Sequence, residues 1–65
     1  MKLQIKDSGA WRNIASIAEP QRAAVMAAGA DLLRSLQQPM TDLRIADGDQ
    51  VIYRCSGADY LWRPV

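Results

Sequence analysis

The fold is decided by residues 19–39, EPQRAAVMAAGADLLRSLQQP, which place one helix between two prolines. Pro20 suits the first helical position, where its missing N–H costs nothing. From there to Gln38 the segment is rich in Ala, Leu, Arg and Gln, which favour helices. Pro39 ends the helix because it restricts the residue before it. Apolar residues at a spacing of 3.6 predict one buried stripe. The stripe comprises Val25, Ala28, Gly29, Leu32, Leu33 and Leu36, with Met26 at its margin.

Two strands are predicted before this helix. Residues 2–6, KLQIK, alternate polar and apolar side chains, as in a strand with one buried face. Residues 7–9, DSG, supply turn chemistry, because Gly9 adopts a positive φ without strain. Residues 10–17 return as a second strand whose alternation is imperfect. A bulge near Asn13, or an early helical turn from Ser16, would account for that irregularity. The pattern places Trp11, Asn13, Ala15 and Ile17 on one face and Ile14 on the other.

A three-stranded meander is predicted after the helix. Residues 42–46 and 50–55 alternate around Asp47-Gly48, a strong hairpin signal. A turn at 56–58 leads to a last strand at 60–63. The order β-β-α-β-β-β predicts a small antiparallel sheet with one helix packed on one face, an α+β fold formed by residues 1–65 as a single domain.

The size and composition exclude several function classes. A chain of 65 residues with a net charge of +1 has room for one thin core, and it cannot also enclose a deep pocket for a small-molecule substrate. One cysteine permits no internal disulfide. The first residues lack the apolar run of a signal peptide, and no window is apolar enough for a membrane span. These features predict a cytoplasmic protein that does not contact membranes.

The residues needed for common catalytic sites are missing. The chain has no histidine and one cysteine, so it lacks the commonest general base and the ligands for zinc. No phosphate-binding glycine loop is present. The aspartates fall mostly at turns, where they serve backbone hydrogen bonds, and Cys55 falls on the predicted core face. We therefore expect no enzyme activity, no cofactor and no metal, although carboxylates contributed to a composite site with another subunit remain an alternative.

Basic residues are concentrated in the predicted strands. If Val51, Tyr53 and Cys55 face the helix, alternation places Arg44 and Arg54 on the opposite face of the sheet. The other candidate binding residues in strands are Lys2, Lys6, Arg12 and Arg63. Such a face can dock an acidic partner or a nucleic-acid backbone. The alternative is a solvated face that arginine stems simply cover.

The helix and the C-terminal end offer two further binding candidates. Ala23, Ala27 and Ala30, with Arg34 below them, form a smooth strip predicted to face away from the core, where a partner or a second copy of the chain can approach closely. High helix propensity explains the same alanines without a partner. Trp62 is a candidate interface anchor, and its alternative role is the lid of a small core.

Together these patterns predict a non-catalytic interaction protein. Its partner is another protein or a second copy of the chain, bound through the arginine-bearing sheet face or the alanine-rich helix face. The alternative is a small nucleic-acid-binding domain that uses the same basic face with Trp11 or Trp62. The size and plain composition suit a small accessory protein of a bacterium or bacteriophage, although no motif supports that origin.

Overall fold

Five strands and one α-helix follow one another in the predicted order β-β-α-β-β-β. The computed structural model describes residues 1–65 and confirms the α+β fold. The strands are β1 (Lys2–Asp7), β2 (Ala10–Ser16), β3 (Asp42–Asp47), β4 (Gln50–Cys55) and β5 (Trp62–Pro64), and the helix is α1 (Arg22–Leu36), preceded by the 3₁₀ turn η1 (Glu19–Gln21).

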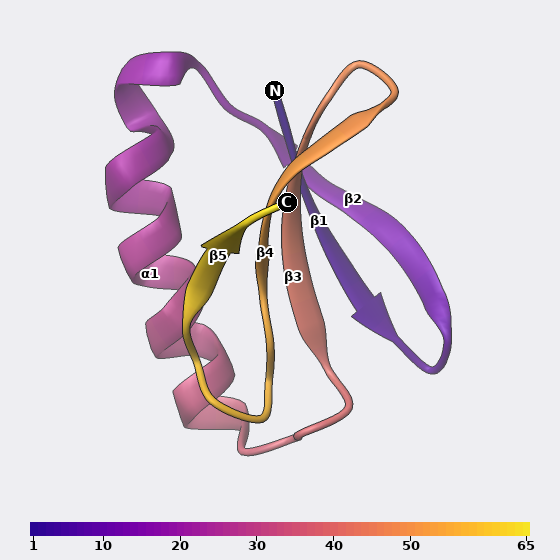
Figure 1. The fold of residues 1–65 in the computed structure, drawn as a ribbon. Coiled ribbons are helices and arrows are strands. Elements are labelled where there is room, and N and C mark those ends of the chain that lie inside the picture. Colours follow the sequence, from indigo (N-terminus) through magenta and orange to yellow (C-terminus); the bar gives the residue numbers. More distant parts are fainter.

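The strands form one antiparallel sheet in the order β2-β1-β3-β4-β5. Strands β1 and β3 are neighbours although the helix separates them in the chain. The N-terminal hairpin of β1 and β2 and the C-terminal meander of β3, β4 and β5 therefore form one continuous sheet. In Figure 1, α1 lies on the side of β4 and β5, and the β1–β2 hairpin lies on the side away from the helix.

The helical segment begins and ends close to Pro20 and Pro39, as predicted. The side chain of Gln21 accepts a hydrogen bond of 3.0 Å from the N–H of Ala18, which satisfies one free donor before the first turn. At the other end Gln37 adopts a left-handed conformation, with φ of 52°, and its N–H donates to the carbonyl of Leu33. Neither helical segment is long and apolar enough to cross a membrane.

The core lies between α1 and the middle of the sheet. Leu33 of the helix packs against Leu43 and Cys55, and all three are almost completely buried. Around them lie the partly buried side chains Ile5, Ala30, Tyr60 and Trp62. Gly29 allows the close approach of the two layers, because a Cβ atom there would lie 2.9 Å from Leu43 and 3.2 Å from Trp62.

The helix is rotated from the predicted orientation. The prediction that Ala30 faces away from the core is wrong, because Ala30 packs against the core cluster. Two leucines of the predicted stripe are instead largely exposed, Leu32 at 43% and Leu36 at 41%. Trp62 explains the rotation: its indole N–H donates a hydrogen bond of 2.6 Å to the carbonyl of Met26 and draws the Met26–Ala30 side of the helix onto β5.

Strand β2 contains the predicted irregularity. Gln4 pairs with Asn13 and Leu3 pairs with Ala15, which leaves Ile14 as an extra residue in a bulge. Directly paired residues point to the same face of a sheet. Ala15 therefore shares the helix-facing side with Leu3, and the prediction that it shares a face with Trp11 is wrong because the bulge reverses the alternation.

The last strand starts later than predicted. Residues 60–63 were expected to form it, whereas β5 spans Trp62–Pro64. Tyr60 has a φ of 63°, which belongs to a turn and interrupts an extended strand. The N–H of Tyr60 donates to the carbonyl of Ser56, and this bond closes the turn between β4 and β5.

Candidate binding face of the sheet

The side of the sheet opposite α1 carries most of the polar strand residues. Because Ile5, Leu43 and Cys55 point toward the helix, their neighbours along each strand point away from it. We call this side the open face. Its residues are Lys2, Gln4, Lys6, Trp11, Asn13, Ser16, Asp42, Arg44, Ala46, Val51, Arg54 and Arg63. The prediction that Val51 faces the helix is wrong, because a register shift leaves Ile52 as an extra residue and pairs Val51 with Ala46, the partner of Lys2.

Three arginines of the open face stand directly opposite one another. Arg44 of β3 pairs with Arg54 of β4, which pairs with Arg63 of β5. On the other side Arg44 pairs with Gln4, which pairs with Asn13. These five residues form a cross-strand row, with one member per strand and a strand spacing of about 4.8 Å. Like charges placed opposite each other destabilise a sheet, so this row needs compensating groups.

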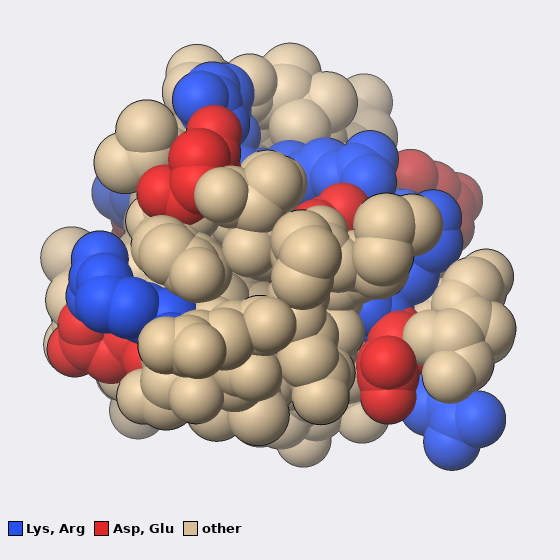
Figure 2. All heavy atoms as spheres, turned by 90° about the horizontal axis from the view of Figure 1, so that it is seen from below, with Lys and Arg blue, Asp and Glu red and all other residues tan.

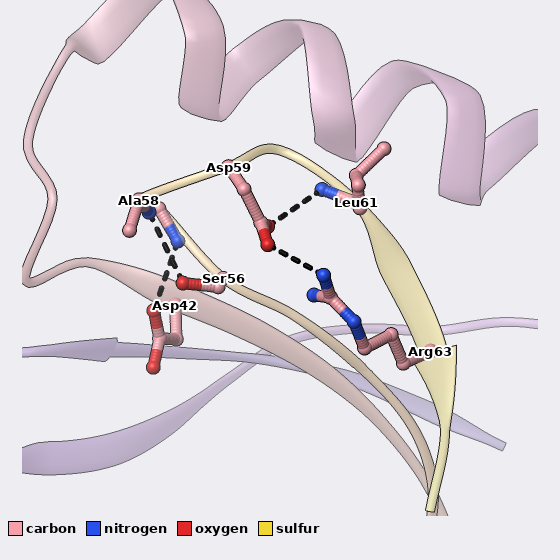
Figure 3. Close-up of polar contacts among 7 residues, drawn as sticks. Asp42, Ser56, Ala58, Asp59, Leu61 and Arg63 are labelled. Atoms are coloured by element: carbon pink, nitrogen blue, oxygen red, sulfur yellow. Dashed lines mark hydrogen bonds and ion pairs between the residues drawn. The ribbon is translucent and has the colours of Figure 1, made fainter.

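Two arginines of the row have carboxylate partners. Arg54 forms an ion pair of 2.8 Å with Asp42, and Arg63 forms one of 2.7 Å with Asp59. Figure 3 shows Asp59 between Arg63 and the N–H of Leu61 and also shows Asp42 below the same turn. The hydrogen bond from Arg63 lowers the pKa of Asp59. Both arginine side chains remain about half exposed, but Asp42 is largely buried, so only the pair of Arg63 with Asp59 is exposed on both sides and open to exchange.

Arg44 differs from its neighbours in the row because it contacts no carboxylate. Its Nε donates a hydrogen bond of 2.6 Å to the side-chain oxygen of Gln4. Its guanidinium lies 4.1 Å from the centre of the Trp11 ring, and that of Arg54 lies 5.5 Å from the same ring. Gln4 is held in turn by a hydrogen bond of 2.8 Å from its amide nitrogen to Asn13. Arg44 is thus a half-buried cation held only by neutral groups.

Asp42 links the open face to the turn between β4 and β5. One oxygen accepts from Arg54, and the other accepts a hydrogen bond of 3.0 Å from the N–H of Gly57. Burial opposes ionisation of this carboxyl, but the bonds from Arg54 and Gly57 outweigh it, and the pKa of Asp42 is lowered. The same carboxylate therefore fixes both an arginine of the row and the backbone of a turn.

The lowered pKa of Asp42 predicts a contribution to stability that depends on pH. A carboxyl whose folded pKa is depressed stabilises the fold above its ordinary value of about 4 and loses that contribution as pH falls through the folded pKa. Asp42→Asn retains an oxygen for Gly57 but loses the charge. We expect the variant to unfold at lower urea concentration than the parent at neutral pH, with the difference shrinking as pH falls through the lowered pKa of Asp42. Asp49→Asn, which removes the same charge from a turn without an ion pair, is the control. A difference that persists in acid would contradict this role.

Several predicted binding residues lie elsewhere. Arg12 pairs with Ile5 and so points to the helix-facing side, apart from the cross-strand row. Trp62 packs on the core and bonds to Met26, as the lid interpretation predicts. Because neither belongs to the open face, the tryptophan that accompanies the arginines is Trp11.

The alanine strip of the helix is shorter than predicted. Ala23 and Ala27 are exposed, but Ala30 is withdrawn into the core contacts. Arg34 forms an ion pair of 2.7 Å with Asp31 and lies over the ring of Tyr60. The strip thus loses its third member, and its arginine is occupied by Asp31 and Tyr60, so the strip is a weaker binding candidate than the open face.

The charges are unevenly spread over the surface. Figure 2, viewed from the end where α1 finishes, shows acidic side chains beside several of the basic ones and a broad area without charge between them. The exposed apolar residues near the C-terminal end of α1 are Leu36 and Met40. The uncharged area contains no pocket, and nothing in the structure shows what would cover it.

The structure shows no cluster of side chains that would bind a metal ion and no exposed thiol. No group of three or more Cys, Asp or Glu side chains lies close enough together to hold a metal ion. Cys55 is fully buried, and burial raises the pKa of its thiol, which favours the unreactive protonated form.

Comparisons with protein-family models, with curated proteins and with solved structures found no match.

Proposed function

We propose that the protein is a non-catalytic binding protein whose open face docks an acidic segment of a partner protein. The observation that carries this proposal is the cross-strand row, in which Arg44, Arg54 and Arg63 stand opposite one another and Arg44 has no carboxylate. Natural sequences break local stability rules mainly at functional positions. Carboxylates from a partner would offset the repulsion that the free protein retains.

The chemistry of the row suits carboxylate groups. Guanidinium forks match the geometry of a carboxylate and form paired hydrogen bonds with it. The pair of Arg63 with Asp59, which is exposed on both sides, can exchange its aspartate for a group of a partner, since such a pair contributes at most about 1 kcal/mol. Lys2 and Lys6 extend the positive charge along β1.

A protein partner fits this face better than a nucleic acid. Only Lys2, Lys6 and Arg44 are basic groups of the face without an acidic partner, which is few for a phosphate backbone. A platform for single strands also needs an aromatic ring that is free to stack on bases. The ring of Trp11 is occupied by Arg44 at 4.1 Å.

Charge reversal at one arginine tests the proposal. We expect the protein to bind a fluorescein-labelled octaglutamate peptide at low ionic strength, measured by fluorescence anisotropy. Arg44→Glu should weaken binding at least about tenfold, because it replaces the attractive charge with a repulsive one. Arg12→Glu changes the net charge equally on the helix-facing side of the sheet and should leave affinity within about twofold.

Two results would overturn the proposal. The first is equal loss of affinity in Arg44→Glu and Arg12→Glu, which would show that net charge alone matters. The second is tighter binding of a deoxythymidine oligonucleotide than of the peptide by the parent protein, which would favour nucleic acid. Circular dichroism of both variants verifies that they are folded.

A further inference from the structure

We infer that Arg44 is a preorganised fork that grips one aspartate or glutamate side chain of the partner through both of its terminal nitrogens. This inference rests on the proposed function and assigns it a specific anchor point. It distinguishes a shaped carboxylate site from a face that attracts acidic proteins by charge alone.

The guanidinium of Arg44 is held from two directions. Its Nε is bound to Gln4 at 2.6 Å, and one face of its plane lies against Trp11 at 4.1 Å. Gln4 is fixed by Asn13, so residues from β1 and β2 position a side chain of β3. A side chain already held in place loses little conformational freedom when it binds, which raises affinity.

The terminal nitrogens of Arg44 remain as hydrogen-bond donors for a ligand. With Nε used by Gln4, the N–H groups of both terminal nitrogens of Arg44 make no hydrogen bond within the chain. The pair of terminal nitrogens can donate to two oxygens of one planar group, which is the geometry of a carboxylate. Four of the other five arginines already use a terminal nitrogen or Nε on an acidic side chain. The fifth, Arg12, is exposed and has no such support.

The local charge favours a carboxylate over a phosphate group. Arg54, the nearest guanidinium, is neutralised by Asp42 at 2.8 Å. Arg44 itself supplies one positive charge, which balances a carboxylate, whereas a phosphorylated side chain carries about two charges, would need Lys2 or Lys6 as well, and would meet Asp42 nearby. We therefore assign the ligand as an aspartate or glutamate side chain.

Variants that keep the charge of the protein test the fork. Arg44→Lys retains one positive charge but loses the paired donors and the planar stack, and Gln4→Met removes the support of Nε with little change in volume. We expect Arg44→Lys to weaken binding of the octaglutamate peptide about tenfold and Gln4→Met to weaken it about threefold. Lys6→Arg, also on the open face and charge-preserving, is the control and should change affinity less than about twofold.

Nuclear magnetic resonance supplies a second measurement that folding stability does not affect. The Nε–H signal of Arg44, identified by its absence in Arg44→Lys, should shift on addition of the peptide more than the signals of Arg12 and Arg34. Unchanged affinity in Arg44→Lys together with weak binding by Arg44→Glu would overturn the fork and leave the proposed function standing. No binding by the parent protein would instead overturn the proposed function. A peptide with one phosphoserine that binds more than about tenfold tighter would overturn the carboxylate assignment.

Discussion

Gly57→Ala is expected to leave the chain unfolded under conditions in which the parent protein folds. A Cβ atom at this position would lie 2.6 Å from the carbonyl oxygen of Gln38 and closer still to that of Thr41. Both obstacles are backbone atoms, so no rotation of a side chain can make room. Gly57 is also buried, and its N–H is bound to Asp42.

The expected loss exceeds about 4 kcal/mol, because relief of the clash requires separation of the β4–β5 turn from the segment before β3. A domain of this size has a total stability of roughly 3–10 kcal/mol, so the loss consumes most of it. Far-ultraviolet circular dichroism during urea titration measures the effect.

Gly48→Ala is the matched control for the turn variant. Gly48 has a φ of 62°, but a Cβ there would meet nothing within 4 Å. Backbone strain alone should cost about 1–2 kcal/mol, and the variant should still fold. A Gly57→Ala protein as stable as Gly48→Ala would contradict the close packing of the turn.

Leu33→Ala is expected to cause the largest loss among core substitutions in the helix. Leu33 is 1% exposed and joins the helix to Leu43 and Cys55, the centre of a core with few fully buried members. Removal of three buried carbon atoms with incomplete collapse of the cavity costs about 2–5 kcal/mol. The free energy of unfolding in urea should fall by that amount.

The neighbouring residue provides the control for this substitution. Leu32 is 43% exposed, and alanine has the higher helix propensity, so Leu32→Ala should cost less than about 1 kcal/mol. Equal losses at the two positions would contradict the rotation of the helix described above.

The local signals in the sequence were sufficient for the order of elements. Pro20 and Pro39 bracket the helix, Gly9 and Gly48 take the positive φ values that tight turns need, and alternation placed Arg44 and Arg54 on the side away from the helix. Each of these features depends on residues close together in the chain, where backbone geometry and side-chain periodicity are decisive.

The features that sequence reasoning missed depend on distant contacts. The helix turns Ala30 inward because Trp62, thirty-six residues after Met26, bonds to the Met26 carbonyl. Alternation assigns a strand residue to a face but gives no register, so it did not show that Arg44, Arg54 and Arg63 stand opposite one another. Alternation also did not predict that Trp11 contacts Arg44. That contact depends on the pairing of β1 with β3, which the sequence of neither strand reveals alone.

That pairing has a kinetic consequence for the open face. Gln4 and Arg44 are forty residues apart, and the carboxylate fork exists only where the two ends of the chain have met. Long-range strand pairing is the slow part of folding, because the closure of a large loop costs entropy before contacts repay it. The meander and its helix can assemble from nearer neighbours, so we expect the support of Arg44 by Gln4 to form last, when the first hairpin docks. We expect a ligand bound by Arg44 to stabilise the docked hairpin, because the guanidinium is held in place only while Gln4 is paired with it.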